Sequence, residues 1–206
     1  MKKIFLISFI SIVAFSSTFA QLEKGRLLIS LDGNFAKNSH ESSTDISILN
    51  TRTLNLSPAI GFSLAKNFTL GLGVDLSWNK QAYLMNITEL PGFQTDFQVE
   101  NSSNSYLPYA FLGYYYEIFT RFYVGGQFHI KFGFAQEKQG NQTNKGNIIA
   151  ASISPEINYF ISRHFAVYLS LGEFGYSMSM FDNYDKSNWL INFSPTQWAL
   201  GIRVAI

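Results

Sequence analysis

The sequence predicts an all-β fold, an eight-stranded antiparallel up-and-down transmembrane β-barrel. Three observations carry this prediction. The chain begins like a secreted protein, its composition is rich in aromatic residues and poor in charge, and apolar residues alternate with small or polar ones over long runs.

The N-terminal segment is typical of a secretory signal peptide. Lys2 and Lys3 precede an apolar run over 4–15, and the small residues Thr18 and Ala20 follow. The apolar run has about 12 residues, whereas a helix needs about 20 to span a membrane. We therefore expect a signal peptide over 1–20, cleaved between Ala20 and Gln21, and a single barrel domain over 21–206.

The composition narrows the class of protein. Aromatic residues make up 17% of the chain and charged residues 14%, against roughly 25% charged in ordinary soluble domains. Cysteine is absent, so disulfides do not stabilise the fold. Cleavage would leave 13 basic against 14 acidic residues, a balance that argues against nucleic acid as a partner. These features favour the cell outer membrane, with its lipid as the surroundings.

The strands are predicted from an alternation with a period of two, since neighbouring side chains of a strand point to opposite faces. Over 68–79, for example, apolar residues at even positions oppose Thr69, Gly71, Gly73, Asp75, Ser77 and Asn79. The runs are long enough to cross a bilayer at a tilt, and small polar inner faces suit a narrow barrel. We expect eight strands, over 25–37, 52–64, 68–79, 105–117, 121–136, 147–161, 165–179 and 193–206.

The connections between these strands alternate in length. Those at 65–67, 118–120 and 162–164 are short, whereas 38–51, 80–104, 137–146 and 180–192 are long and polar. Short turns at one end and long loops at the other are typical of outer-membrane barrels, with the turns periplasmic. The alternative is a ten-stranded barrel with extra strands over 81–86 and 93–100, although an extension of the barrel above the membrane is favoured.

Three prolines fall inside predicted strands, at Pro58, Pro108 and Pro155. Because proline has no N–H to donate to a ladder, we expect a bulge or a weakened rung at each of them.

A repeated motif carries a resemblance. Ser57-Pro58-Ala59-Ile60-Gly61-Phe62 matches Ser154-Pro155-Glu156-Ile157-Asn158-Tyr159. The chain resembles the small outer-membrane β-barrel family, the OmpA-barrel and OmpX-like group, in its Bacteroidetes-type form. The alternating run from Trp198 to Ile206 resembles the last strand that the outer-membrane assembly machinery reads, although an aromatic residue is usual there. The resemblance implies that machinery as a partner, but no functional residues to carry over.

No catalytic, cofactor or metal motif is found. The histidines His40, His129 and His164 lack the spacing of metal ligands. A deacylase-type barrel needs a serine two residues after an outward histidine, but Lys131 follows an inward His129, and the four residues 21–24 leave no room for the leading helix of a palmitoyltransferase type. We therefore expect no enzyme. The alternatives are a soluble exported lipocalin-like carrier of an apolar ligand and, third, a lipid-modifying outer-membrane enzyme.

The expected role is structural or surface-interacting, with a packed lumen and little or no conductance. Loops 80–104 and 38–51 are the candidate sites for a surface partner, because loops carry function more often than scaffolds do. Charges at inward positions are expected to pair in a structural network, since buried charges need partners; they are Arg26, Asp32, Asp75, Glu117, Lys131, Glu156 and Arg203.

Overall fold

The computed structural model describes residues 24–38, 46–90, 93–140 and 142–206. The predicted signal peptide with Ala20 and Gln21 lies outside the described residues, and so does His40. The described strands are β1 Leu27–Asn38, β2 Ile46–Ala65, β3 Phe68–Leu90, β4 Phe93–Phe119, β5 Phe122–Gln139, β6 Gln142–Phe160, β7 Phe165–Ser170, β8 Glu173–Phe181, β9 Tyr184–Asn192 and β10 Ala199–Ala205. No helix in the described part of the chain is long and apolar enough to cross a membrane.

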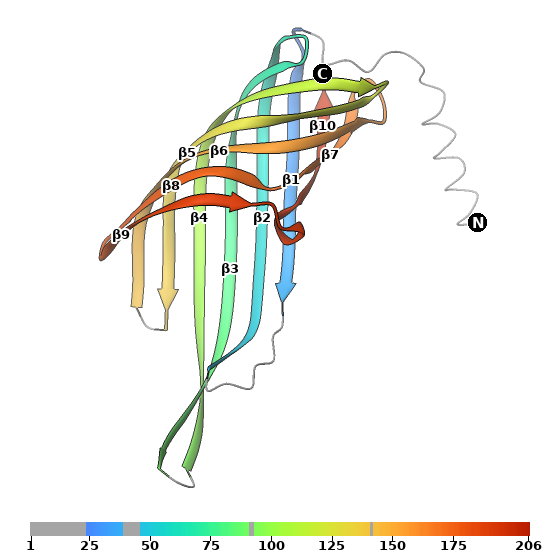
Figure 1. Cartoon of the computed structure of the whole chain (residues 1–206). Helices are drawn as coiled ribbons and strands as arrows, with labels where there is room; N and C mark the ends of the chain where they lie inside the picture. Colours follow the sequence, from blue (N-terminus) through green and yellow to red (C-terminus); the bar gives the residue numbers. More distant parts are fainter. Residues whose placement is uncertain (1–23, 39–45, 91–92, 141) are drawn as a thin grey trace, which may run out of the picture.

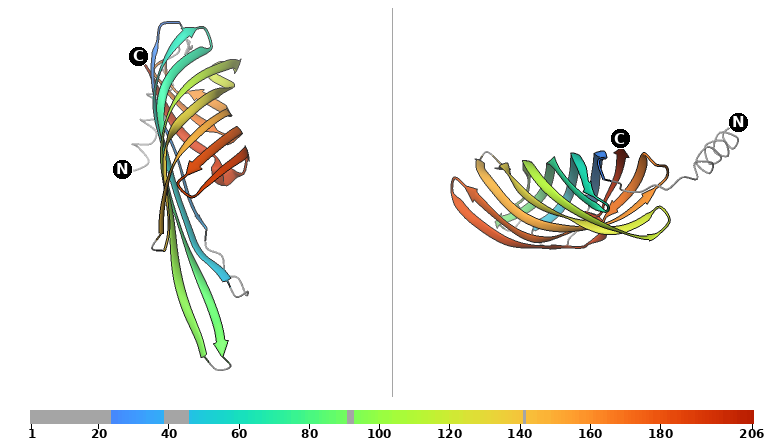
Figure 2. Two further views of the ribbon diagram at one scale, coloured as in Figure 1. Left: turned by 90° about the vertical axis from the view of Figure 1, so that its left-hand side faces the viewer. Right: turned by 90° about the horizontal axis from the view of Figure 1, so that it is seen from above.

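Antiparallel ladders join eight of these strands into a ring (Figures 1 and 2). The strands β1 to β6 pair in chain order, β6 pairs with β7, β7 with β10, and β10 with β1. The predicted eight-stranded up-and-down fold is therefore confirmed. The remaining segments belong to the same pattern, because β8 continues β7 beyond a break and β9 precedes β10 in the same way.

The break between β7 and β8 lies at Leu171 and Gly172, opposite Pro155 of β6. The β6 ladder runs with β7 over Glu156–Phe160 and with β8 over Gly146–Ile153. Between them the Leu171 N–H donates to the Pro155 carbonyl at 3.0 Å. Gly172 has a φ of +103°, which a residue with a side chain rarely adopts. The strand predicted over 165–179 is thus two strands joined by a bulge.

The other two prolines weaken one ladder each, as predicted. No rung joins β2 to β3 between Leu56 and Ala59, where Pro58 lies, and none joins β4 to β5 between Tyr106 and Tyr109, where Pro108 lies. Both prolines keep a partner on the other side, Leu31 for Pro58 and Val74 for Pro108. Each proline therefore interrupts two consecutive residue pairs of one ladder without breaking the strand.

Several segments predicted as loops are strands. Residues 46–51 belong to β2, 80–90 and 93–104 to one long β3–β4 hairpin, 142–146 to β6 and 184–192 to β9. The hairpin extends past the other strands, at the lower end in Figure 1, as the favoured alternative for 80–104 had it. The loop predictions rested on polarity, but a backbone ladder forms equally between polar residues once the strands leave the apolar surroundings.

The predicted strand over 193–206 is wrong in its first part. Residues 193–198 leave the ladder, with a 3₁₀ turn at Pro195–Gln197, and β10 begins at Ala199. Proline favours such a turn because its φ is fixed and its N–H is absent. The side-chain amide of Asn34 donates to the carbonyls of Thr196 and Trp198, at 2.6 and 2.9 Å, and so fastens this segment to β1.

We call the end of the barrel with the short turns at 65–67, 118–120 and 162–164 the turn end, and the opposite end the loop end. The ring is closed at the turn end and open on one side at the loop end. The β1–β10 ladder covers Leu28–Gly33, and no ladder among the described residues joins β9 to the rest of β1. In Figure 1, β8 and β9 swing to one side while β1 stays upright on the other. We call the gap between β9 and β1 the seam.

The two faces of the sheet differ in chemistry. Large apolar side chains cover the outer face, including Leu70 and Leu72 of β3, Ile130 of β5 and Leu200 of β10. The inner face carries glycine, serine, asparagine, tyrosine and the charged residues. The predicted orientation is therefore confirmed, with Leu72 63% exposed on the outside and Asp75 and Lys131 turned inward at 24% and 13%.

Candidate functional site

The turn end of the lumen is filled with side chains. Its core consists of Leu28, Tyr115, Tyr123, Phe160, Ala166 and Ala205. The Tyr123 and Phe160 rings meet edge to face, with their centroids 5.3 Å apart. Serine, threonine and asparagine at 63, 69 and 158 are completely buried beside them. This turn-end core closes the barrel on that side.

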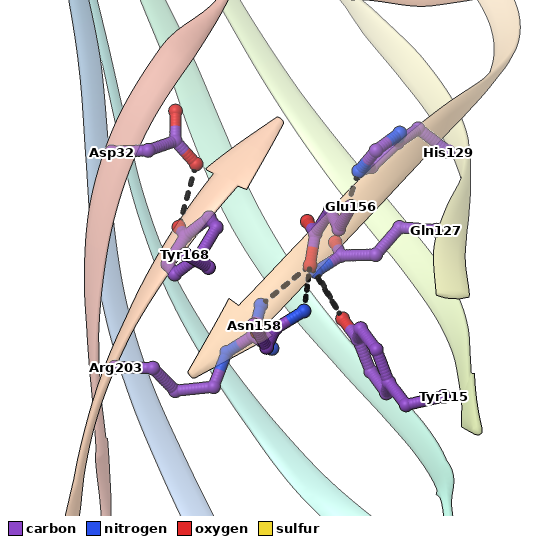
Figure 3. Close-up of polar contacts among 8 residues, drawn as sticks. All are labelled: Asp32, Tyr115, Gln127, His129, Glu156, Asn158, Tyr168 and Arg203. Atoms are coloured by element: carbon purple, nitrogen blue, oxygen red, sulfur yellow. Dashed lines mark hydrogen bonds and ion pairs between the residues drawn. The ribbon is translucent and has the colours of Figure 1, made fainter. Parts of the chain in front are cut away.

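Arg203 lies between this core and the rest of the lumen and is 2% exposed. Its guanidinium bonds the Glu156 carboxylate at 3.1 Å and the Asn158 amide oxygen at 2.7 Å (Figure 3). The same guanidinium stands over the Tyr168 and Tyr115 rings, 4.5 and 5.1 Å from their centroids. One cation thus ties β10 to β4, β6 and β7, and burial makes these charge-assisted bonds strong.

A directed chain of hydrogen bonds leads from Glu156 to His129 (Figure 3). The Tyr115 hydroxyl donates to Glu156 at 3.0 Å, and the Gln127 amide nitrogen donates to Tyr115 at 2.7 Å. The Gln127 oxygen is left to accept from Nε2 of His129, 3.1 Å away. His129 faces the lumen, as predicted, with a carboxamide as the partner of its ring.

Glycines on the inner face give the tyrosine rings their space. Gly201 of β10 stands between Asp32 and Tyr168 in the ladders, and a Cβ at this position would overlap the Tyr168 ring. The ring therefore lies across β10, and its hydroxyl donates to Asp32 at 2.7 Å. Gly73 does the same for the ring of Tyr109, its partner on β4.

Lys131 forms a second ionic cluster nearer the loop end. Its ammonium group contacts Asp75 at 2.7 Å and Glu173 at 3.2 Å, and the Ser57 hydroxyl donates to Asp75 at 2.7 Å. The cluster links β2, β3, β5 and β8 across the lumen. The ion pairs of the Lys131 and Arg203 clusters therefore connect different strands across the lumen.

The two remaining predicted lumen charges lie apart from these clusters, near the turns. Arg26 donates to the carbonyl of Arg163 at 2.9 Å, and Glu117 hydrogen-bonds the Tyr123 hydroxyl. The prediction thus placed seven charges in one network, whereas the structure divides them between the turn rim and the two clusters.

Glu173 belongs to the Lys131 cluster, although it was not among the predicted lumen charges. In an uninterrupted strand over 165–179, a residue at this position would share the outward face with Phe165 and Val167. The bulge at Leu171 and Gly172 reverses the phase, so that Glu173 points inward and Phe174 outward. The available signal was the shift of apolar residues from odd positions before Gly172 to even positions after it.

The uncharged partners Tyr115, Gln127, Asn158 and Tyr168 were also missed. They hold the charges in place, and each occupies an inward position of a predicted strand. Among the described residues, no group of three or more histidine, cysteine, aspartate or glutamate side chains is arranged to hold a metal ion.

One further contact lies at the loop end, beyond the apolar outer surface. The Tyr184 hydroxyl at the start of β9 donates to the Glu137 carboxylate of β5 at 2.6 Å. This hydrogen bond raises the pKa of Tyr184 above the ordinary value, because it favours the protonated hydroxyl.

Comparisons with known proteins give structural similarities alone. No protein-family model matches the chain, and no curated protein does. The fold is similar to Ail, the attachment invasion locus protein of Yersinia pestis, with 16% identity over 89% of this chain and 99% of that one, and a TM-score of 0.41. It is also similar to the outer membrane protease OmpT of Escherichia coli, with 10% identity over 92% and 97% of the chains and a TM-score of 0.36. A third likeness is the beta domain of the Bordetella autotransporter BrkA, with 7% identity over 89% and 99% and a TM-score of 0.32.

Proposed function

We propose that the chain is an outer-membrane β-barrel protein with a structural or surface-interaction role. The observation that supports this proposal is the direction in which the side chains of the barrel wall, the ring of eight strands, point. Large apolar side chains surround the ring on the outside, while the charged clusters of Arg203 and Lys131 lie inside. A bilayer is the solvent that matches an apolar outer wall and a ring of strands that the β1–β10 ladder closes at the turn end.

The lipocalin-like carrier requires the opposite orientation. Such a carrier lines its cavity with apolar side chains and turns a polar face to water. Here Leu72, Ile130 and Leu200 are more than half exposed on the outside, far more apolar surface than a soluble monomer presents in one patch. The wall therefore supports the membrane protein over the carrier.

The lumen is packed at its turn end, whereas a cavity of about 410 Å³ remains nearer the loop end, so the predicted packing holds for one part of the lumen only. The packed part argues against a general porin. The turn-end core is buried, and Arg203 and Glu156, 2% and 4% exposed, bridge the barrel directly above it. An eight-stranded barrel has an interior just wide enough for side chains, whereas general porins have 16–18 strands around a channel. We therefore place the functional surface at the loop end.

A non-enzymatic role is part of the proposal. Nε2 of His129 is bonded to Gln127, and no hydroxyl nucleophile is paired with the ring in the described part of the chain. Acyl transfer of the deacylase type needs such a pair. The lipid-modifying enzyme therefore remains the third alternative.

The β3–β4 hairpin is the surface we propose for a partner. Its β4 arm pairs with β3 from Phe93 onward, but its ladder with β5 begins only at Asn101. The outer edge of β4 over 93–99 thus pairs with no strand among the described residues, and its backbone groups can pair with an added strand. Of the segment 38–51, which is also proposed for a partner, residues 46–48 belong to β2 and pair with 83–85 of β3.

Localisation tests the proposal directly. The full chain is expressed with its N-terminal segment, the envelope is fractionated, and unheated and boiled samples are compared on gels. We expect the mature protein in the outer-membrane fraction, with a folded form that migrates differently until it is boiled. Recovery of the folded protein from the soluble periplasmic fraction would overturn the proposal in favour of the carrier.

A charged residue introduced on the outer face should distinguish a wall that faces lipid from one that faces water, by its effect on the free energy of unfolding. Leu72 lies midway along the apolar part of β3, and Leu72→Arg should lower the free energy of unfolding in lipid vesicles by about 2–4 kcal/mol. The matched control is Gln136→Arg, on the outward face of β5 at the loop end, where its ladder neighbours are Asn104 and Lys145. The expected loss is about 1 kcal/mol at most, from the like charge of Lys145. Equal effects of the two variants, measured by urea unfolding, would contradict a lipid-facing wall at Leu72.

A further inference from the structure

A cavity of about 410 Å³ lies in the lumen between the Arg203 cluster and the loop end. Its volume is in the range of small-molecule sites. Its lining includes the carboxylates of Asp32, Asp75, Glu156 and Glu173, with Lys131 as the cation among them. Arg203 is paired with Glu156 on the turn side of the cavity. With Arg203 included, the cavity region has two cations and four carboxylates. None of the ion pairs among the described residues includes Asp32, whose hydrogen-bond partners are the uncharged side chains of Tyr168 and Ser57.

His129 supplies a second, independent observation. The ring lines the cavity and is 8% exposed, and its Nδ1 has no hydrogen-bond partner. The chain through Gln127 and Tyr115 ends on Glu156 and Arg203, and this fixes the direction of every donor in it. Nε2 of His129 therefore carries the proton toward Gln127, and in the neutral ring Nδ1 offers a lone pair.

Two asparagines of the cavity lining present further acceptors. The Oδ1 atoms of Asn34 and Asn79 are buried and have no hydrogen-bond partner. The side-chain N–H groups of Asn34 donate to the carbonyls of Thr196 and Trp198. Two of the three ammonium donors of Lys131 are engaged by Asp75 and Glu173. The cavity thus presents four carboxylates and three unpartnered acceptor atoms. Buried polar groups of this kind call for a bound partner.

We propose that this cavity binds a small organic cation with several N–H donors, an alkyl ammonium or guanidinium compound. Such a ligand supplies what the lining lacks: positive charge opposite Asp32 and donors for Nδ1 of His129 and the two asparagine oxygens. Charge-assisted hydrogen bonds to carboxylates are the strong class of such contacts. Asn192 and Gln197 beside the seam belong to the same lining, so the ligand enters from the loop end.

Calorimetric titration of the refolded full chain in detergent at low salt tests the site. The probe is 1,4-diaminobutane, and its neutral diacetylated form is the matched control ligand. We expect saturable binding of the diamine, weakened by added salt, and none of the diacetyl compound. Absence of saturable binding up to about 10 mM, or equal binding of the two compounds, would overturn the proposal.

Two variants locate the binding. Asp32→Asn keeps an acceptor for Tyr168 and removes the charge, so it should weaken diamine binding about tenfold. Glu117→Gln removes a carboxylate at the turn rim, outside the cavity lining, and should leave affinity unchanged. If Asp32→Asn does not refold, Glu173→Gln takes its place. Unchanged affinity in the refolded cavity variant, or an equal loss in Glu117→Gln, would exclude the cavity as the site.

The nitrogen resonances of His129 give a readout that does not depend on affinity. In ¹⁵N spectra of the refolded protein, the free ring should show an unprotonated Nδ1, assigned by its absence from His129→Gln. The diamine should shift the Nδ1 signal, because an N–H donor now reaches it, while the ring of His164 in the turn at 161–164 stays unchanged. Saturable binding without any change at Nδ1 would contradict the assigned position. These results do not depend on where the protein is localised.

Discussion

Replacing Arg203 by methionine should lower the free energy of unfolding by about 3–5 kcal/mol, the usual cost of removing one partner from a buried ion pair. Glu156 would keep its bonds from Tyr115 and Asn158 but lose the only cation that touches it among the described residues. Methionine fills much of the volume of arginine, so the loss reports the stranded charge more than a void. Urea unfolding of the refolded protein in lipid vesicles, followed by gel migration without boiling, measures it.

The double variant Arg203→Met with Glu156→Gln is the control for this prediction. It removes both charges and keeps an acceptor for Tyr115, so it should regain most of the stability that the single variant loses. If the double variant were as unstable as Arg203→Met, the cost would come from lost packing against Tyr168 and Tyr115. The ion pair would then contribute little to the stability of the barrel.

Gly172→Ala should have the second large effect. Its φ of +103° costs an alanine about 1–2 kcal/mol, and the added Cβ would overlap the carbonyl oxygen of Asn192 in β9. Overlap with backbone adds about 1–3 kcal/mol, since neither strand can move without breaking the bulge. We expect a loss of about 2–5 kcal/mol in urea unfolding, and altered fluorescence of Trp189 and Trp198, which lie in and after β9.

Gly140→Ala separates the two causes. Gly140 has a φ of +55° in the β5–β6 turn, and nothing lies within 4 Å of the Cβ it would carry. Alanine there should cost about 1–2 kcal/mol at most, from the left-handed backbone alone. Similar losses in the two variants would mean that β9 moves away from Gly172 at no cost.

Alternation of side chains was enough to predict the ring, because a period of two fixes both the strand and the face of every residue in it. Over 68–79 it placed Leu70 and Leu72 outside and Asp75 inside, as the structure has them. The limits of the strands were harder to predict. Polarity marked 80–104 as a loop, yet hydrogen bonding between backbones does not require apolar side chains, and the hairpin continues to Leu90 and Phe93.

The charged residues of the candidate site could be predicted from the sequence, but the residues that they contact could not. Asp32, Asp75, Lys131, Glu156 and Arg203 were identified because charge is conspicuous on a small, polar inner face. Which charges meet depends on the stagger between distant strands, which no local pattern records. To identify Glu173, the reversal of phase at Gly172 was needed as well. One extra residue in a strand turns every later side chain to the opposite face, and so brings Glu173 to Lys131 in the lumen.

The ladder that closes the ring has a consequence for how the barrel is made. It pairs Leu28–Gly33 with residues 200–205, so it joins the first strand that the structure describes to the last. Contacts between such distant parts of a chain form slowly, and until they form β1 and β10 each present an unpaired edge. We therefore expect closure late in folding, and an unfinished sheet needs its two open edges shielded from those of neighbouring chains until the final strand pairs.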